Sequence, residues 1–369
     1  MNEDVFRFCD DVGPEKTVLI YNPALGLKAI VVVDNIAAGP AIGGTRMEPD
    51  VTLEECVRLA RAMTLKNAAA GLPHGGAKSV IVGDPAMPLQ QKERLIRAFA
   101  QAIGAIESYV PGPDMGTDEQ AMAWIKDEIG RCVGLPRQIG GIPLDEIGAT
   151  GFGLAVAAEA AQEYCPVRLH GARVVVQGFG SVGMHAARFL SERGAILVGA
   201  ADSRSATFNP NGFDIGALIA HKSGGASVGS FEGGDSMDGN DVIGIPCDIW
   251  IPAARPDVIN RDNVNRLDCK LVLQGANIPA TPEAEEFLHQ TGVLSVPDFI
   301  VNSGGVICGS VEYHGGIQSA AFAAIEEKIH ANTHSVLRDA AEKNITPRAA
   351  AVAFAESNLR KAMGWQRWH

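Results

Sequence analysis

Two lysines and one aspartate stand where charged side chains can do chemistry. Lys66 precedes the run Asn67-Ala68-Ala69-Ala70, and twelve residues later Lys78 follows a glycine pair. Small and apolar neighbours indicate a crowded, partly dry site, in which two nearby ammonium groups disfavour each other's charged form. Asp114 follows in a turn rich in Pro and Gly. The set suits proton transfer, and solvated surface charge is the alternative interpretation for either lysine.

A second pattern, Gly178-Phe179-Gly180-Ser181-Val182-Gly183, is typical of dinucleotide binding. It directly follows an apolar run, 173–177, and opens a segment with Ala186, Phe189 and Leu190 at helical spacing. Glycines permit the tight turn and the close approach of backbone to a pyrophosphate, whose charge lies at the helix N-terminus. We therefore expect Gly178, Gly180, Ser181, Val182 and Gly183 to bind a cofactor. An ordinary glycine-rich turn is the alternative.

Asp202 ends the next apolar run, 24 residues after Gly178. An acid at about 20 residues from the first glycine binds the ribose hydroxyls of NAD, and its charge repels the 2′-phosphate of NADP. The pattern favours NAD. Ser203 and Arg204 follow at once and would suit a phosphate, so NADP stays open.

The chain is long enough for two domains, with 369 residues and 46% hydrophobic residues. Short β-branched runs at 17–21 and 29–33 predict strands, and a capping box, Thr52-x-x-Glu55, begins a helix. Beyond residue 140, runs at 173–177, 196–200, 248–251, 270–273 and 293–296 alternate with helical stretches, as in a parallel sheet covered on both faces. The segment 224–240 is rich in Gly, Ser and Asp and is interpreted as a solvated loop. Residues 318–363 return to helix.

The predicted fold is therefore α/β with two domains. Residues 1–138 plus 333–369 form one α/β domain. Residues 139–332 form a Rossmann-like, doubly wound nucleotide domain.

Composition excludes several classes of function. The net charge of −12 argues against nucleic acid, and no apolar run is long enough to span a membrane. The first residues, Met1 to Asp4, are acidic where a secretory signal is basic. Seven cysteines without a C-x-x-C pair signal neither a disulfide framework nor a zinc site, so no metal is expected. A cytoplasmic location is the expectation.

The motifs together resemble the family of glutamate, leucine, phenylalanine and valine dehydrogenases, over nearly the whole chain. The matching segments occur in the family's order: Gly39 to Met47, Met63 to Pro85, Pro111 to Thr117, Ala149 to Gly153, Gln274 to Asn277 and Asn302 to Val306. The first of these is most similar to the leucine and phenylalanine branch. Gln274 departs from the family, which frequently has Glu there.

The resemblance implies NAD(P)-dependent, reversible oxidative deamination of an L-amino acid to a 2-oxo acid and ammonia. Carried over by position, Lys66 would hold the substrate α-carboxylate, Lys78 would be the general base and Asp114 would relay protons. Thr150 and Asn277 would lie near the nicotinamide and the substrate. The remaining expected contacts are to substrate at Ile42, Gly43, Gly44 and Gly309, and to cofactor at Ala253 and Ala254. The resemblance also implies a cleft between the two domains, a substrate-binding and oligomerisation role for residues 1–138 plus 333–369, and a homo-oligomer.

The resemblance also bears on the substrate side chain. In the glutamate branch a lysine and a serine hold the distal carboxylate, and Ile42 and Gly309 occupy those positions here. Neither residue pairs with a carboxylate, so an apolar substrate such as leucine, valine or phenylalanine is expected. Three alternatives remain: a glutamate dehydrogenase, a carboxylate site restored by Arg46, and a catalytically silent amino-acid or nucleotide sensor.

Overall fold

The chain folds into two compact units. The computed structural model describes residues 6–366, so the acidic start at Met1 to Asp4 lies outside the described residues. Unit 1 comprises Met1–Pro143, Val306–Ala321 and Phe354–His369, and unit 2 comprises Leu144–Gly305 and Phe322–Ala353. Each unit has its own sheet, which confirms the predicted α/β fold class.

Within the described residues, unit 1 is built on a five-stranded sheet in the order β1-β2-β4-β3-β5. Strands β1 and β2 are antiparallel, β2 runs antiparallel to β4, and β3 is parallel to both β4 and β5. The strands are β1 (Lys16–Asn22), β2 (Leu27–Asn35), β3 (Ala41–Glu48), β4 (Gly76–Val82) and β5 (Tyr109–Pro113). The predicted strands at 17–21 and 29–33 are confirmed as β1 and β2.

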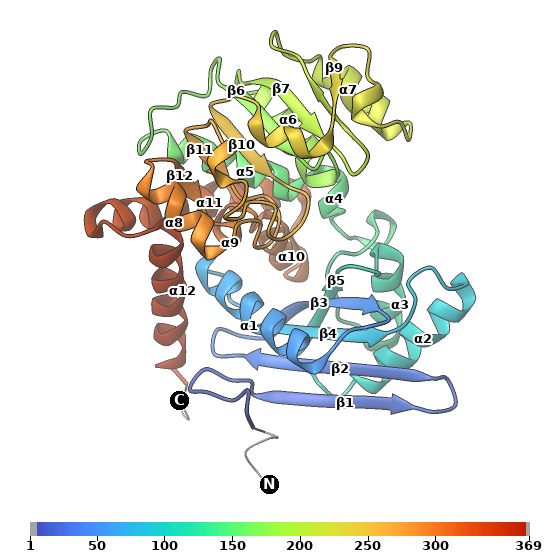
Figure 1. Ribbon diagram of the computed structural model, residues 1–369. Coiled ribbons are helices and arrows are strands. Elements are labelled where there is room, and N and C mark those ends of the chain that lie inside the picture. The colour runs from blue at the N-terminus through green and yellow to red at the C-terminus, as the bar shows by residue number, and fades with distance from the viewer. Residues whose placement is uncertain (1–5, 367–369) are drawn as a thin grey trace. The chain divides into compact units, whose positions relative to one another are not determined.

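Helices cover both faces of this sheet (Figure 1). Helix α1 (Leu53–Ala69) packs through Val57 and Ala60 on Val32 and Val80. Its predicted cap is confirmed, because Thr52 Oγ1 accepts the Glu55 N–H at 3.1 Å. Helices α2 (Leu89–Ala102) and α3 (Glu119–Ile129) bury the other face.

Unit 2 holds a sheet in the order β12-β11-β10-β6-β7-β8-β9. From β12 to β7 the strands are parallel, and β8 and β9 extend the sheet antiparallel. The strands are β6 (Arg173–Gln177), β7 (Ile196–Ala201), β8 (Ala206–Phe208), β9 (Asp235–Met237), β10 (Ile249–Pro252), β11 (Leu271–Leu273) and β12 (Leu294–Val296). All five predicted parallel strands are present.

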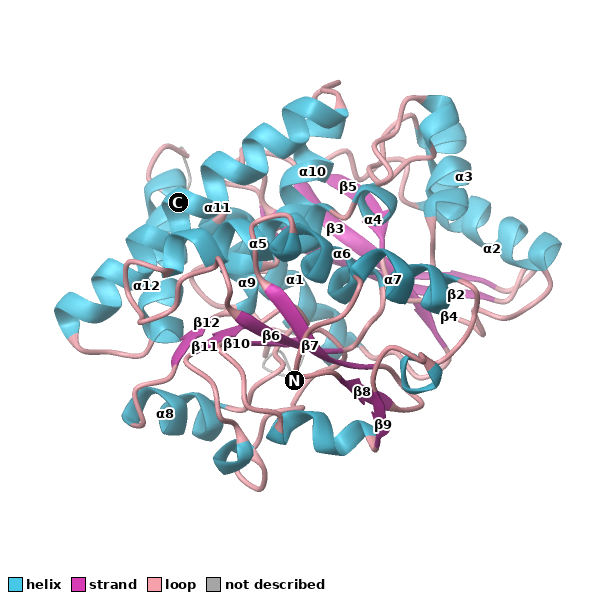
Figure 2. Cartoon of the chain, turned by 90° about the horizontal axis from the view of Figure 1, so that it is seen from above, coloured by secondary structure: helices cyan, strands magenta, loops and turns pink. Residues whose placement is uncertain are grey.

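Helices α5 and α6 lie on one side of this sheet and α8 on the other (Figure 2). The helices that follow α3 are α4 (Leu144–Ile147), α5 (Ala149–Ala161), α6 (Ser181–Ser191), α7 (Ile215–Ser223), α8 (Pro282–Gln290), α9 (Asp298–Val301), α10 (Gly304–Tyr313), α11 (Gln318–Lys343) and α12 (Pro347–Met363). Short 3₁₀ turns are η1 (Arg137–Ile139), η2 (Val228–Ser230), η3 (Gly239–Gly244) and η4 (Val264–Arg266). Thus 224–240 is not a simple loop, because it contains β9 and buried Val228.

The division between the units differs from the predicted boundaries. The first crossover falls at Pro143/Leu144, and the C-terminal part changes unit three more times, after Gly305, Ala321 and Ala353. Residues 306–321 belong to unit 1 because the buried Glu312 carboxylate accepts the backbone N–H of Leu135 at 3.1 Å and of Ile142 at 2.7 Å. Residues 322–353 belong to unit 2, where Arg348 is bound by Glu285.

Two absences hold for residues 6–366. No helix there is both long and apolar enough to cross a bilayer. Nor do three or more His, Cys, Asp or Glu side chains gather in a geometry suited to a metal ion.

Candidate functional site

The predicted catalytic residues of unit 1 share one face of its sheet. Side chains alternate along a strand, so the register that pairs Ile42 with Gly76 and Val110 brings every second residue to the same face. Gly44 on β3 and Lys78 on β4 therefore lie on this face, and Asp114 follows the end of β5. This is the face that α1 covers, since Lys78 pairs in register with Val32.

Lys78 and Asp114 form a direct ion pair. The Lys78 side chain is only 7% exposed, and its Nζ contacts Asp114 Oδ2. The same carboxylate oxygen accepts from Arg46 Nε at 3.3 Å. Arg46 is itself held by Glu55, whose Oε1 accepts from Nη1 at 2.6 Å. Asp114 thus lies between two cations, one of which has a further carboxylate partner.

These charges set the ionisation of Asp114. Burial disfavours the carboxylate form, but the ammonium of Lys78 and the guanidinium of Arg46 outweigh it, so the pKa of Asp114 lies below its ordinary value. The contact therefore favours the charged carboxylate, and Asp114, Lys78 and Arg46 form one largely buried charge cluster.

Two other predicted residues frame this pair. A Cβ on Gly44 would lie 2.8 Å from the Asp114 Cβ, so only glycine admits the carboxylate at this point of β3. A Cβ on Gly43 would overlap the backbone carbonyl of Ala77, an even closer approach. Lys66 lies half-buried in the last turn of α1, where the helix dipole favours a cation.

The predicted specificity residues belong to a small apolar cluster. Ile42 is 4% exposed and packs with Val110, Val133 and Tyr313. Gly309 on α10 joins it, since a Cβ there would lie 3.5 Å from Val133 Cγ2, at ordinary van der Waals distance. Ile42 and Gly309 therefore both lie beside Val133, in apolar surroundings.

Unit 2 contains a cavity of about 680 Å³ at the carboxyl ends of β6, β7 and β10. The predicted cofactor residues that line it are Gly178, Gly180, Asp202, Ala253 and Ala254. Gly178 has φ +102°, and a Cβ there would lie 2.6 Å from the backbone of Ala253, so glycine is required. Gly180 caps α6 and has open space where a Cβ would be. A pyrophosphate can therefore approach the backbone at this helix N-terminus.

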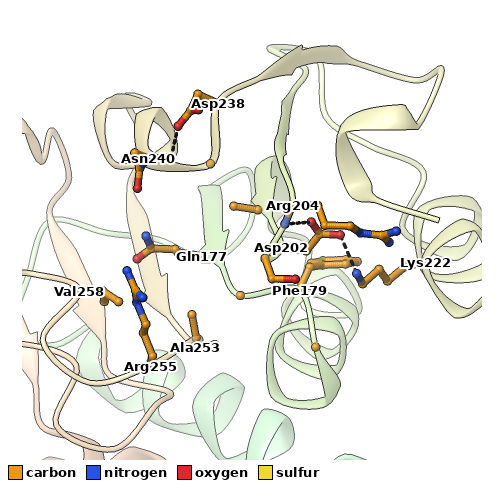
Figure 3. Close-up of a pocket in the computed structure, with 16 residues that line it drawn as sticks. Gln177, Phe179, Asp202, Arg204, Lys222, Asp238, Asn240, Ala253, Arg255 and Val258 are labelled. Atoms are coloured by element: carbon orange, nitrogen blue, oxygen red, sulfur yellow. Dashed lines mark hydrogen bonds and ion pairs between the residues drawn. The ribbon is translucent and has the colours of Figure 1, made fainter. Parts of the chain in front are cut away.

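The Asp202 carboxylate is fully engaged within the protein. Oδ1 accepts from the N–H groups of Arg204 and Ser205 and from Ser227 Oγ, while Oδ2 accepts from Lys222 Nζ and the Val228 N–H, all between 2.6 and 3.1 Å. Burial opposes its charge, but these donors hold the pKa of Asp202 well below its ordinary value. A carboxylate offers about four lone-pair sites, so a ribose hydroxyl would have to replace or share one of these five donors. Asp202 organises the loop that borders the cavity (Figure 3).

The remaining predicted residues lie at helix starts or in a loop of unit 2. Ser181, Val182 and Gly183 form the first turn of α6, and Thr150 is the second residue of α5. Asn277 is exposed after β11, and its Oδ1 accepts from Asn302 Nδ2 at 3.1 Å. They are not among the residues that line the cavity.

The sequence analysis missed several polar residues of the cavity, among them Lys222, Arg255 and Asn240. Lys222 points to Asp202, Arg255 lies on the side of Gln177 and Val258, and Asn240 comes from η3 (Figure 3). Lys222 is in the last turn of a helix, Arg255 in a loop and Asn240 in the segment interpreted as solvated. Of these, only the position of Arg255 just after a buried strand carried a signal, because ligands bind beyond the carboxyl ends of parallel strands.

Comparison with known protein families identifies the family of this chain. The family described as Glutamate/Leucine/Phenylalanine/Valine dehydrogenase matches residues 140–367, and the Glu/Leu/Phe/Val dehydrogenase dimerisation domain matches residues 17–131. The chain belongs to the Glu/Leu/Phe/Val dehydrogenase family. It is an amino-acid dehydrogenase that depends on a nicotinamide dinucleotide, and the resemblance inferred from its motifs is confirmed.

Relatives of this dehydrogenase cover most of its length. It is 36% identical to a glutamate dehydrogenase of Aeropyrum pernix over 358 residues, which span 90% of this chain and 85% of that protein. The hetero-hexameric glutamate dehydrogenase of Thermus thermophilus, solved in a Leu-bound form, superposes with a TM-score of 0.84 at 31% identity, covering 95% and 89% of the two chains. L-tryptophan dehydrogenase of Nostoc punctiforme gives a TM-score of 0.75 at 24% identity, covering 98% and 100% of the two chains, and shares the fold.

Proposed function

We propose that this dehydrogenase oxidatively deaminates an apolar L-amino acid to its 2-oxo acid and ammonia, with NAD as the cofactor. The observation that carries the proposal is the buried apolar cluster of Ile42, on the same sheet face as the Lys78–Asp114 pair. A substrate bound with its α-carbon at the ion pair would present its side chain to apolar groups.

The chain's own residues would bind the substrate and move its protons. Lys66 would hold the α-carboxylate. Lys78, in its neutral form, would take a proton from the water that attacks the iminium carbon, and Asp114 would exchange protons with the substrate nitrogen. The bound nicotinamide supplies the acceptor for the hydride that leaves the α-carbon. The cavity at Gly178 and Gly180 fits the dinucleotide, since its backbone is open at the N-terminus of α6.

The proposal of an apolar substrate side chain depends on whether any cation of the protein is free to pair with a distal carboxylate of the substrate. Arg46, the candidate for restoring a carboxylate site, already contacts Glu55 at 2.6 Å and Asp114 at 3.3 Å. Moving it to a substrate would remove this cation from Glu55 and would leave Asp114 with Lys78 alone. Glutamate remains the second candidate, because relatives at 36% identity are glutamate dehydrogenases.

A panel of L-amino acids tests the proposed function. We expect NADH formation with leucine, valine or phenylalanine at a kcat/KM on the order of 10²-fold or more above that for glutamate, because a distal carboxylate buried against Ile42 has no partner. The assay measures initial rates of reduced dinucleotide formation with NAD and with NADP. Preference for glutamate would show that the second candidate is right.

The cofactor preference follows from the charge balance of one loop. The Asp202 carboxylate places a negative charge beside the cavity, which disfavours a 2′-phosphate, and Lys222, which contacts it at 2.6 Å, offsets only part of this effect. We therefore propose NAD as the preferred cofactor, with NADP accepted less well.

Two substitutions with opposite effects test this balance. Asp202→Ser leaves Lys222 uncompensated, so the ratio of kcat/KM for NADP to that for NAD should rise on the order of tenfold, and Lys222→Met should lower it. Steady-state kinetics with both dinucleotides measure the ratio. Simple disruption of the loop would instead reduce the use of both dinucleotides together. A shift in the same direction for both variants would contradict the charge argument.

We also propose that the protein is a homo-oligomer. Strand β1 is an edge of the unit 1 sheet and exposes Leu19 at 72% and Tyr21 at 67%. An exposed edge strand with large apolar side chains is a template for pairing with another chain. The match of residues 17–131 to the family's dimerisation domain supports this assignment.

A further inference from the structure

A buried charge network in unit 2 is centred on Arg348, the second residue of α12. Its Nε donates to both oxygens of Glu285 at 2.7 and 2.6 Å. Its Nη2 donates to Gln274 Oε1 at 2.7 Å and to Asp298 Oδ1 at 2.9 Å. The Glu285 and Asp298 side chains are only 8% and 7% exposed, so each carboxylate needs this cation.

The network reaches the loop of Asn277 through Asp298. The second oxygen, Oδ2, accepts the backbone N–H of Ile278 at 2.9 Å. Ile278 has φ +48°, which is costly for a β-branched residue, so its surroundings must hold it in this conformation. Asp298 thereby fixes the peptide that joins Asn277 to Ile278.

A second contact holds the other side of the same residue. Asn302 Nδ2 donates to Asn277 Oδ1 at 3.1 Å and to the Gly275 carbonyl at 3.3 Å. Asn277 is thus positioned by a side-chain contact and, through its neighbour's peptide, by a charge-assisted hydrogen bond. Only the hydrogen bond from the Ile278 N–H to Asp298 depends on Arg348.

We propose that Arg348 is a positioning residue for the reaction, which acts by holding Asp298 and so orienting Asn277. The inference rests on the proposed function and on the place near the nicotinamide and the substrate that the family resemblance implies for Asn277. Without the guanidinium, buried Asp298 loses its countercharge, and its side chain turns either to solvent or to another donor. In both cases the bond to Ile278 weakens and the strained loop relaxes.

Arg348→Met tests the proposal in the full-length enzyme. We expect kcat to fall on the order of tenfold or more, because small displacements of a substrate-positioning group have large effects on rate. The KM for the dinucleotide should stay within about twofold, since Arg348 and its partners do not line the cavity. Arg348→Lys keeps a cation for Asp298 and should recover part of the loss. A change in dinucleotide KM with an unchanged kcat would overturn the proposal.

Glu285→Gln is the matched control. It removes a charge from the same network but leaves Arg348 paired with Asp298. We expect a lower Tm and a kcat within about twofold of the parent enzyme. A loss of kcat equal to that of Arg348→Met would show that the network acts only through stability, which overturns the proposal.

A double-mutant cycle with Asn277→Ala identifies the route of the effect. If Arg348 acts through Asn277, Arg348→Met should lower kcat by less than about twofold further in the Asn277→Ala enzyme. Full additivity, with Asn277→Ala itself impaired, overturns this proposal and leaves the proposed function standing. An unchanged kcat for Asn277→Ala overturns both the role assigned to Asn277 and this inference.

Discussion

Lys78→Met should lower kcat for deamination on the order of 10³-fold while dinucleotide affinity stays within about twofold. Removal of a general base costs about 10²- to 10⁴-fold, and the cavity that fits the dinucleotide is built from other residues. Methionine keeps the length and volume of the apolar part of the side chain at a site that is 7% exposed. Asp114 retains Arg46 as a partner at 3.3 Å, so no buried carboxylate is left alone.

Lys28→Met is the control for this variant. Lys28 is exposed on β2, the strand next to β4, so its loss removes a positive charge from the same sheet without touching the ion pair. It should keep kcat within about twofold. Stopped-flow measurement of the hydride-transfer step separates chemistry from product release. Lys78→Met turnover within tenfold of the parent would exclude the assigned role.

The sequence predicts best those parts of the fold in which burial is compatible with only one secondary structure or one residue type. Residues 173–177 match β6 to the residue, because an uninterrupted β-branched run is stable only as a strand buried on both faces. The fingerprint glycines are equally predictable, since φ +102° at Gly178 and its contact with Ala253 exclude side chains.

Strand β4, which carries Lys78, is not predicted by the same patterns. Its first residues are Gly76, Ala77 and Lys78, whose strand propensity is low. Tertiary packing determines this strand, because β4 lies between β2 and β3 and beneath α1. The ion pair that it forms with Asp114 joins residues 36 positions apart, a distance at which local pattern carries no information.

The hydrogen-bond donors around Asp202 could not be predicted from the sequence for a different reason. The spacing places the acid correctly after β7, but three of its five donors come from Lys222, Ser227 and Val228, which follow it by 20, 25 and 26 residues. Their segment is rich in Gly, Ser and Asp, which is typical of solvated loops, yet Val228 is fully buried. A composition average cannot show that one carboxylate organises such a segment.

The substrate side chain gives the second large expected effect: Ile42→Lys combined with Gly309→Ser should invert the preference between leucine and glutamate. Lysine at position 42 supplies a cation to a distal carboxylate, and a Cβ at position 309 fits at 3.5 Å from Val133 Cγ2 without displacing it. Pairing a charge that was buried alone is worth several kcal/mol, so the ratio of kcat/KM for glutamate to that for leucine should rise on the order of 10³-fold.

Gly309→Ser alone is the control and should change the ratio by less than about tenfold, since a hydroxyl adds no charge. Both substrates are measured on one preparation, so the ratio does not depend on the fraction of folded enzyme. An unchanged ratio in the double variant would mean that the distal end of the substrate binds away from Ile42, and the apolar assignment would then have to rest on other residues.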